Sequence, residues 1–86
     1  MSQFHARVFV NLRDSVLDPA GEATKSAATR LGIKGIHKLR IGKAIDLDIT
    51  ASTQEEAKKI VESLTERLLA NPVIESWTYE FKSSST

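Results

Sequence analysis

Apolar and polar residues alternate from Phe4 to Leu12, which predicts a β-strand with one face in a core. One side of this strand carries the regular apolar series Ala6, Val8, Val10 and Leu12. Phe9 is an apolar exception on the other side. Alternation also predicts strands at residues 36–41 and 44–51, with Ile41-Gly42-Lys43-Ala44 between them at hairpin spacing. A last strand is expected from Val73 to Phe81, although its apolar residues fall on both faces.

Helix-start signals precede two further segments. Asp18 is a suitable N-cap, Pro19 fits the first helical position, and Gly32 is placed to end this first helix in a left-handed conformation. Small and apolar residues are expected to form its inner side: Ala20, Ala23, Ala27 and Leu31.

A second helix begins after one of two overlapping capping boxes, Ser52 with Glu55 or Thr53 with Glu56. Its core-facing residues are predicted to be Ala57, Ile60, Val61, Leu64 and Leu68. It should end near Ala70, because Pro72 disfavours helix at the residue before it.

The element order β-α-β-β-α-β predicts an α+β fold of the ferredoxin-like, split βαβ class. In that fold a four-stranded antiparallel sheet has two helices on one face. We expect a single domain over residues 1–81 and a disordered serine-rich tail over residues 82–86. The sheet face without helices should carry Phe9 and either Ile74 or the aromatic set of the last strand, and such an apolar patch favours association.

Composition narrows the function classes. The chain has 86 residues and no cysteine, so neither disulfides nor a thiolate metal site can support its small core, and oligomerisation is expected. A cysteine nucleophile is excluded.

The charge balance and hydropathy restrict the possible partners. The chain has twelve Lys and Arg against eleven Asp and Glu, so it lacks the basic excess typical of nucleic-acid binding. No apolar run is long enough for a membrane span and the N-terminus lacks signal-peptide features, so we expect a cytoplasmic protein.

Candidate chemistry is sparse. Val16 and Leu17 are either contacts for a partner or a hydrophobic staple on the following helix. Gly21 weakens the first helical turn, and the close approach of another backbone would explain why a glycine stands there. The basic segment Arg40-Gly42-Lys43 could meet an anion or a partner's carboxylate, or could be a solvated turn with glycine at positive φ. Asp46 with Asp48 is interpreted as a solvated face. His5 and His37 lack neighbours at metal-ligand spacing, and there is no glycine-rich phosphate loop.

Three segments in this order resemble the PurS family, the small subunit of phosphoribosylformylglycinamidine synthase. They are LRDSVLDPAG (12–21), LRIGK (39–43) and LLANPVIE (68–75), and the similarity extends over roughly residues 4–81. Arg13 stands where the family often has lysine, which keeps the charge, and Ala20 stands where it often has glutamine, which removes a polar group.

The resemblance implies a non-catalytic assembly subunit of a purine-biosynthesis ligase. In that complex a glutaminase subunit releases ammonia with a cysteine nucleophile, and a large synthase subunit uses ATP and Mg²⁺ to form the amidine. The small subunit pairs with itself and bridges the two, so that ammonia does not cross bulk solvent. The resemblance thus implies no cofactor on this chain and no activity of the chain alone. The contact positions expected on these grounds are Arg13, Val16, Leu17, Asp18, Pro19, Gly21, Arg40, Gly42, Lys43, Asn71 and Pro72.

Other uses of this fold class fit less well. An acylphosphatase would need a glycine-rich phosphate loop with an arginine after the first strand, and residues 13–18 contain two acids and no glycine. An RNA-binding module would need aromatics on its central strands, where only Phe9 is present. A small-molecule-sensing regulatory domain, or a generic protein-interaction module of ferredoxin-like fold, is the remaining alternative.

Overall fold

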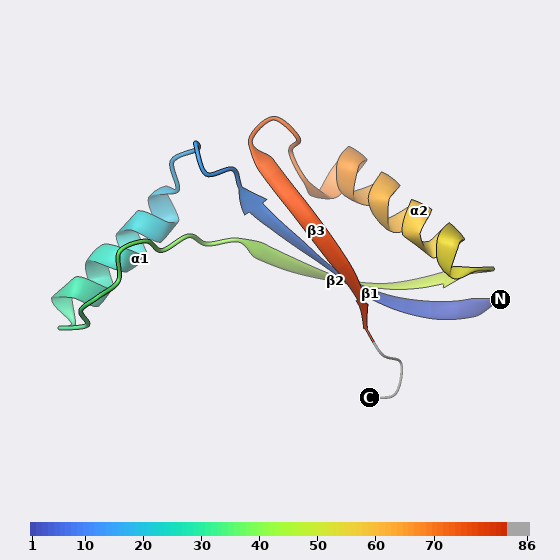
Figure 1. Cartoon of the computed structure of the whole chain (residues 1–86), viewed down its shortest axis with the longest axis horizontal. Coiled ribbons are helices and arrows are strands. Elements are labelled where there is room, and N and C mark those ends of the chain that lie inside the picture. Colours follow the sequence, from blue (N-terminus) through green and yellow to red (C-terminus); the bar gives the residue numbers. More distant parts are fainter. Residues whose placement is uncertain (83–86) are drawn as a thin grey trace.

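The computed structural model describes residues 1–82 as a small sheet with one helix on it and a second helix set apart (Figure 1). The strands are β1 (Ser2–Leu12), β2 (Lys43–Ala51) and β3 (Glu75–Lys82), which form an antiparallel sheet in the order β2-β1-β3. The helices are α1 (Pro19–Arg30) and α2 (Gln54–Leu64), and α2 continues into a π-helix, η1 (Thr65–Leu69). The α+β class is therefore confirmed. The predicted tail lies, apart from Lys82 at the end of β3, outside the described residues.

The core lies between α2 and one face of the sheet. Ala6, Val8 and Val10 of β1 are buried there against Val61 of α2. The sheet register places Tyr79 beside Val8 and Trp77 beside Val10, so the aromatics of β3 share this face. The alternation predicted for β1 is thus confirmed.

The opposite face of the sheet, here called the outer face, is ionic. The His5 ring is paired with Asp48, and Arg7 is paired with Asp46 at 2.8 Å from Nε to Oδ1. Phe9 is half-buried among these polar neighbours, and Ile74 lies just outside β3. The expected apolar patch on the uncovered face is therefore wrong, because the register of β3 turns its aromatic side chains toward α2.

The predicted strand at residues 36–41 is absent from the described part of the chain, and so is the hairpin that would have joined it to β2. The sheet has three strands instead of four, and β2 is an edge strand. Gly42 does not adopt a positive φ; it lies against the side chain of Asn11 and the carbonyl of Val10, which a side chain at this position would displace. The chain consequently enters β2 in an extended course instead of through a turn.

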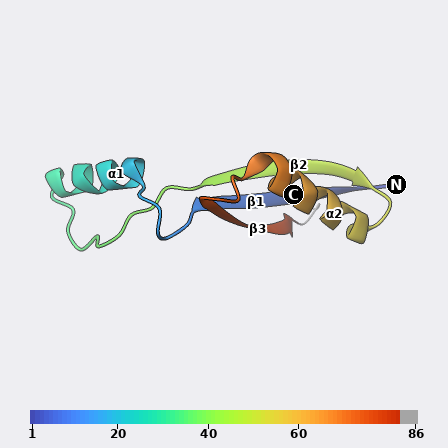
Figure 2. The same ribbon diagram turned by 90° about the horizontal axis from the view of Figure 1, so that it is seen from above.

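Only one helix covers the sheet. Residues 13–42, here called the arm, extend past the end of the sheet and carry α1 away from it (Figure 2). The radius of gyration is 16.7 Å, whereas a compact chain of this length has about 12 Å. The expectation of two helices packed on one face is therefore wrong for the single chain, and the predicted inner stripe of α1 is largely exposed.

The local helix signals are confirmed. The Asp18 and Thr53 side chains cap α1 and α2, and Thr53 accepts from the amide of Glu56, as the second capping box predicts. Gly32 follows α1 with a φ of 84°. The second helix ends before Ala70 as expected, but its last turn is the π-helix η1, and β3 begins two residues later than predicted.

Candidate docking surface

The arm is fixed to its own return segment by one carboxylate. Oδ1 of Asp18 accepts from the amide of Gly21 at 2.9 Å, and Oδ2 accepts from the amide of Ile41 at 2.8 Å. Asp18 is buried, with 4% of its surface exposed. One side chain therefore both caps α1 and ties the helix to the extended strand that returns toward β2.

Both bonds favour the ionised carboxylate. The bond from Ile41, followed by the bond from Gly21, lowers the pKa of Asp18 below its ordinary value of 3.8. Because the pKa in the folded state is the lower one, this stabilisation is present above about pH 4 and is lost as the pH falls through the folded-state value.

An Asp18→Asn variant tests this role. The amide has one acceptor oxygen in place of two, so one of the two bonds is lost. We expect a lower Tm than wild type at about pH 7 and a difference that shrinks as the pH is lowered through the folded-state pKa of Asp18. Thermal unfolding followed by circular dichroism measures both. Asp14→Asn is the matched control, since Asp14 makes only an exposed pair with Lys38 at 3.4 Å; an equal effect of both changes would contradict the assignment.

Gly21 is buried because the return segment passes directly over it. A β-carbon at Gly21 would overlap the carbonyl oxygen of Leu39 and the carboxylate of Asp18. The close backbone approach inferred from sequence is thus confirmed, and it occurs within the chain. Lys25 adds a further tie along α1, donating from Nζ to the carbonyl of His37 at 2.9 Å.

Two arginine side chains join the start of the arm to its return segment and to the turn before β3. Arg13 donates from Nη2 to the carbonyl of Pro72 at 2.8 Å, and its own carbonyl accepts from Nη2 of Arg40 at 2.8 Å. Arg13 also lines two adjoining surface hollows, one with Arg40 and Ser76 and the other with Pro72 and Trp77. Three predicted contact positions thus meet at this place, here called the junction (Arg13, Arg40 and Pro72).

Asn71 shapes the turn beside the junction. Its side-chain Oδ1 accepts from the backbone amide of Val73 at 3.0 Å, and its own backbone amide donates to Oε1 of Glu75 at 2.6 Å. The turn presents Pro72 and Val73 to solvent. Asn71 and Pro72 were expected to be contact positions, and the structure places both next to Arg13.

The other predicted contact positions are more scattered. Leu17 is 73% exposed and does not fold back as a staple, whereas Val16 is half-buried. Pro19 is exposed at the start of α1. Gly42 and Lys43 line a hollow at the start of β2, together with Val10 and Glu75.

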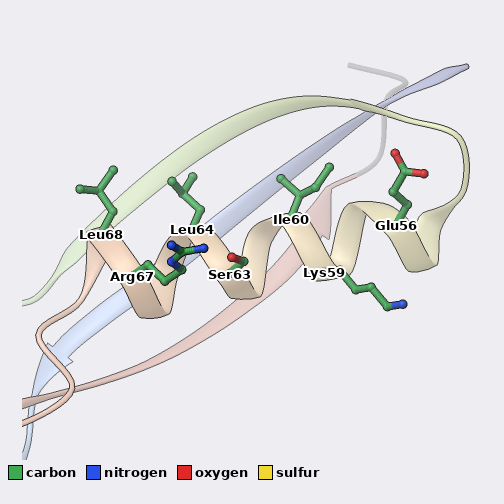
Figure 3. Close-up of a pocket in the computed structure, with 7 residues that line it drawn as sticks. All are labelled: Glu56, Lys59, Ile60, Ser63, Leu64, Arg67 and Leu68. Carbon is green, nitrogen blue, oxygen red and sulfur yellow. The ribbon is translucent and has the colours of Figure 1, made fainter.

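One surface was missed by the sequence reasoning, which assigned its apolar residues to the core. A hollow of about 480 Å³ follows the length of α2 and η1. This α2 groove is lined by Glu56, Lys59, Ile60, Ser63, Leu64, Arg67 and Leu68 (Figure 3). Ile60, Leu64 and Leu68 project from one side of the helix, and Leu68 is 74% exposed. The signal in the sequence was the width of the apolar series on this helix, which extends beyond the residues that the sheet covers.

Metal binding and membrane insertion find no support in the described part of the chain. Within residues 1–82 no group of three potential metal ligands comes together. None of the helices there combines the length and apolarity required to cross a bilayer.

Comparison with known proteins gives a consistent result. Residues 5–83 match the family described as PurS, phosphoribosylformylglycinamidine (FGAM) synthase. The chain is 43% identical over 77 residues to phosphoribosylformylglycinamidine synthase subunit PurS of Synechocystis sp., covering 90% of this chain and 77% of the relative. Against the PurS subunit of Archaeoglobus fulgidus it is 41% identical over 73 residues, covering 85% and 91%.

Solved structures agree. A chain in the structure of PurLQS from Thermotoga maritima superposes with a TM-score of 0.89 and 34% identity, covering 95% of this chain and 100% of that one. The crystal structure of Methanocaldococcus jannaschii PurS, described as one of the subunits of formylglycinamide ribonucleotide amidotransferase in the purine biosynthetic pathway, gives a TM-score of 0.81 at 31% identity, with coverage of 93% and 96%.

Proposed function

This chain belongs to the PurS family, and from that premise we propose that it is the non-catalytic small subunit of a phosphoribosylformylglycinamidine synthase in the cytoplasm. Its role there is to pair with itself and to hold the glutaminase and the large synthase subunit together for ammonia transfer. ATP and Mg²⁺ belong to the large subunit in this proposal, and this chain binds neither.

The observation that carries the proposal is the likeness to the chain in PurLQS, which extends over the whole of that chain. A bridging subunit acts by position, because two sites held in a fixed relation exchange an intermediate without losing it to solvent. The chain's form supports such a role: its longest dimension is 52 Å and its shortest 14 Å. A thin, long body offers much surface for contact relative to its core.

We assign the contacts with the partner subunits to the junction and to the other predicted positions on the arm and at the start of β2. This set contains the predicted positions Arg13, Val16, Leu17, Asp18, Pro19, Gly21, Arg40, Gly42, Lys43, Asn71 and Pro72. Asp18 and Gly21 hold the arm in shape, as their intrachain contacts indicate. Leu17 and Lys43 are exposed and free to contact a partner directly.

Reconstitution with the glutaminase and large subunits of the same organism tests the proposal. We expect glutamine-dependent formation of the amidine only when this chain is present, whereas free ammonium at high concentration should support the reaction without it. Equal glutamine-dependent rates with and without the chain would contradict the assignment.

A Leu17→Glu variant separates docking from folding. Leu17 is exposed, so the variant should unfold at the wild-type temperature. We expect at least a tenfold loss of affinity for the partner subunits, because a charge would be buried at a desolvated contact. Co-purification with the tagged partners and calorimetry measure the two effects. Gln3→Glu, on the far end of β1, is the control and should leave assembly unchanged.

A further inference from the structure

β3 is an edge strand of the described sheet, because the strand order β2-β1-β3 gives it β1 as a neighbour on one side only. Just before β3 begins, the backbone amide of Arg13 donates to the carbonyl of Ile74 at 2.8 Å. Along an antiparallel pair of strands, bonded residue pairs alternate with unbonded ones. Every second residue of β3 after Ile74 therefore exchanges hydrogen bonds with β1, and these residues are Ser76, Thr78 and Glu80.

The backbone groups of the intervening residues point away from β1, toward the open side of β3. Glu75 confirms this direction, since its amide donates at 2.8 Å to the carbonyl of Asn71 in the preceding turn. The next residues with the same orientation are Trp77, Tyr79 and Phe81, here called the β3 edge. Within residues 1–82 no hydrogen bond from outside the sheet reaches their amides or carbonyls. The β3 edge thus presents a row of unpaired backbone groups.

β3 lacks the features that usually protect such a row. Native proteins shield edge strands by short length, proline, bulges or charges on the inward side. β3 has eight residues, contains neither proline nor glycine, and pairs with β1 one to one along its whole length. After Glu75 its inward-facing residues are all aromatic and only half-buried, and the rings of Trp77 and Tyr79 are stacked with their centroids 6.1 Å apart. Such an edge is typical of a strand that receives another strand.

We propose that an extended segment of a partner subunit adds to the sheet along the β3 edge. This inference rests on the proposed function and specifies one surface and the kind of segment that it binds. Main-chain hydrogen bonds to the β3 edge hold the segment in place. Its alternate side chains are apolar and lie beside the aromatic rings on the α2 side, and the intervening ones are polar and lie beside Thr78 on the outer face.

The position of the edge favours a partner subunit over a second copy of this chain. One of the hollows at the junction, lined by Arg13 and Pro72, also reaches Trp77 at the start of the β3 edge. The edge is therefore continuous with the surface assigned to the partner subunits. Two arginines and two glutamates line this hollow, so their formal charges cancel and the segment that passes over it needs no net charge.

Amide hydrogen exchange tests the proposal through the alternation along β3. In the isolated chain the amides of the β3 edge should exchange fast, whereas the intervening amides, which bond to β1, should exchange slowly. In the complex with the glutaminase and large synthase subunits, exchange at the β3 edge should slow by at least about tenfold. The exchange is quenched, and NMR of the chain unfolded in an aprotic solvent reads each amide. An assembled complex in which the β3 edge still exchanges fast would overturn the proposal.

The isolated chain provides the control for self-pairing. Its exchange is measured over a series of protein concentrations without the partner subunits. Protection of the β3 edge that increases with concentration would show that a second copy occupies it, which would also overturn the proposal. A chain that does not bind the partner subunits at all would refute the proposed function together with this inference, whereas assembly with an open β3 edge would refute the inference alone.

A proline variant tests the main-chain bonds directly. Phe81→Pro removes one outward-pointing amide and leaves the bonds to β1 intact, as edge strands tolerate. Phe81→Ala is the matched control, because it removes the same ring and keeps the amide. We expect the proline variant to bind the partner subunits about tenfold more weakly than the alanine variant. Equal affinities would contradict the proposal, and the exchange pattern of the natural chain decides the question if the proline variant does not fold.

Discussion

The Gly21→Ala variant is expected to detach the return segment from α1. The added methyl group would occupy the space of the Leu39 carbonyl oxygen, which belongs to a backbone that cannot rotate away. Alanine favours helix over glycine by about 1 kcal/mol, but overpacking against a fixed neighbour costs about 1–3 kcal/mol. The collision also involves Asp18, so the bond from the Ile41 amide should be lost with it.

Amide hydrogen exchange by NMR measures this effect at the residues concerned. We expect the Ile41 amide to exchange at least about tenfold faster, which corresponds to about 1.4 kcal/mol, while the amides of β1 keep their protection. Gly32→Asn is the control, because nothing lies within 4 Å of Gly32 and asparagine tolerates its positive φ. Unchanged exchange at Ile41 in the alanine variant would refute the close approach.

The Val61→Ala variant is expected to be the most destabilising single change on α2. Val61 is fully buried, with 0% of its surface exposed, and it packs on the central residues of β1. Removing two methyl groups loses roughly 1.6 kcal/mol of transfer free energy, and the remaining cavity raises the cost to about 2–3 kcal/mol. A chain of this length has few kilocalories of total stability, so the change removes a large part of it.

Urea denaturation measures that loss as a lower midpoint at unchanged slope. Val73→Ala makes the same chemical change at a side chain that is 79% exposed, and it should alter the free energy of unfolding by less than about 0.5 kcal/mol. Similar losses in both variants would mean that α2 does not supply the core.

Local chemistry explains which elements could be predicted. Each confirmed signal depends on residues that are close together in the sequence. These signals are the cap at Asp18, the capping box at Thr53 and the alternation in β1 and β2. These signals gave the right elements at nearly the right residues. The strand predicted at residues 36–41 failed because its alternation needs a neighbour to pair with, and in the single chain the neighbouring edge of β2 is out of its reach.

Among the predicted contact positions, too, local effects could be predicted from the sequence and long-range contacts could not. The close backbone approach at Gly21 was predicted correctly, because a glycine in a first helical turn is costly wherever the helix lies. Gly42 was expected either to take part in a contact with a partner or to adopt a positive φ in a turn; it has no positive φ, and it lies in close contact with Asn11, which is distant in sequence. The stripe of α1 was predicted to pack on the sheet and is instead largely exposed, because the arm carries α1 past the end of the sheet (Figure 2). The helical period of this stripe contains no information about the path of the connecting residues.

The ionic pairs of the outer face limit how large an assembly of these chains can become. Asp46 is shared by Arg7 and by Lys82, and Asp48 holds the His5 ring. A flat sheet laid against this surface would have to strip water from all of these groups without offering replacements. Lamination, by which exposed sheets polymerise into fibres, is thus disfavoured on this side.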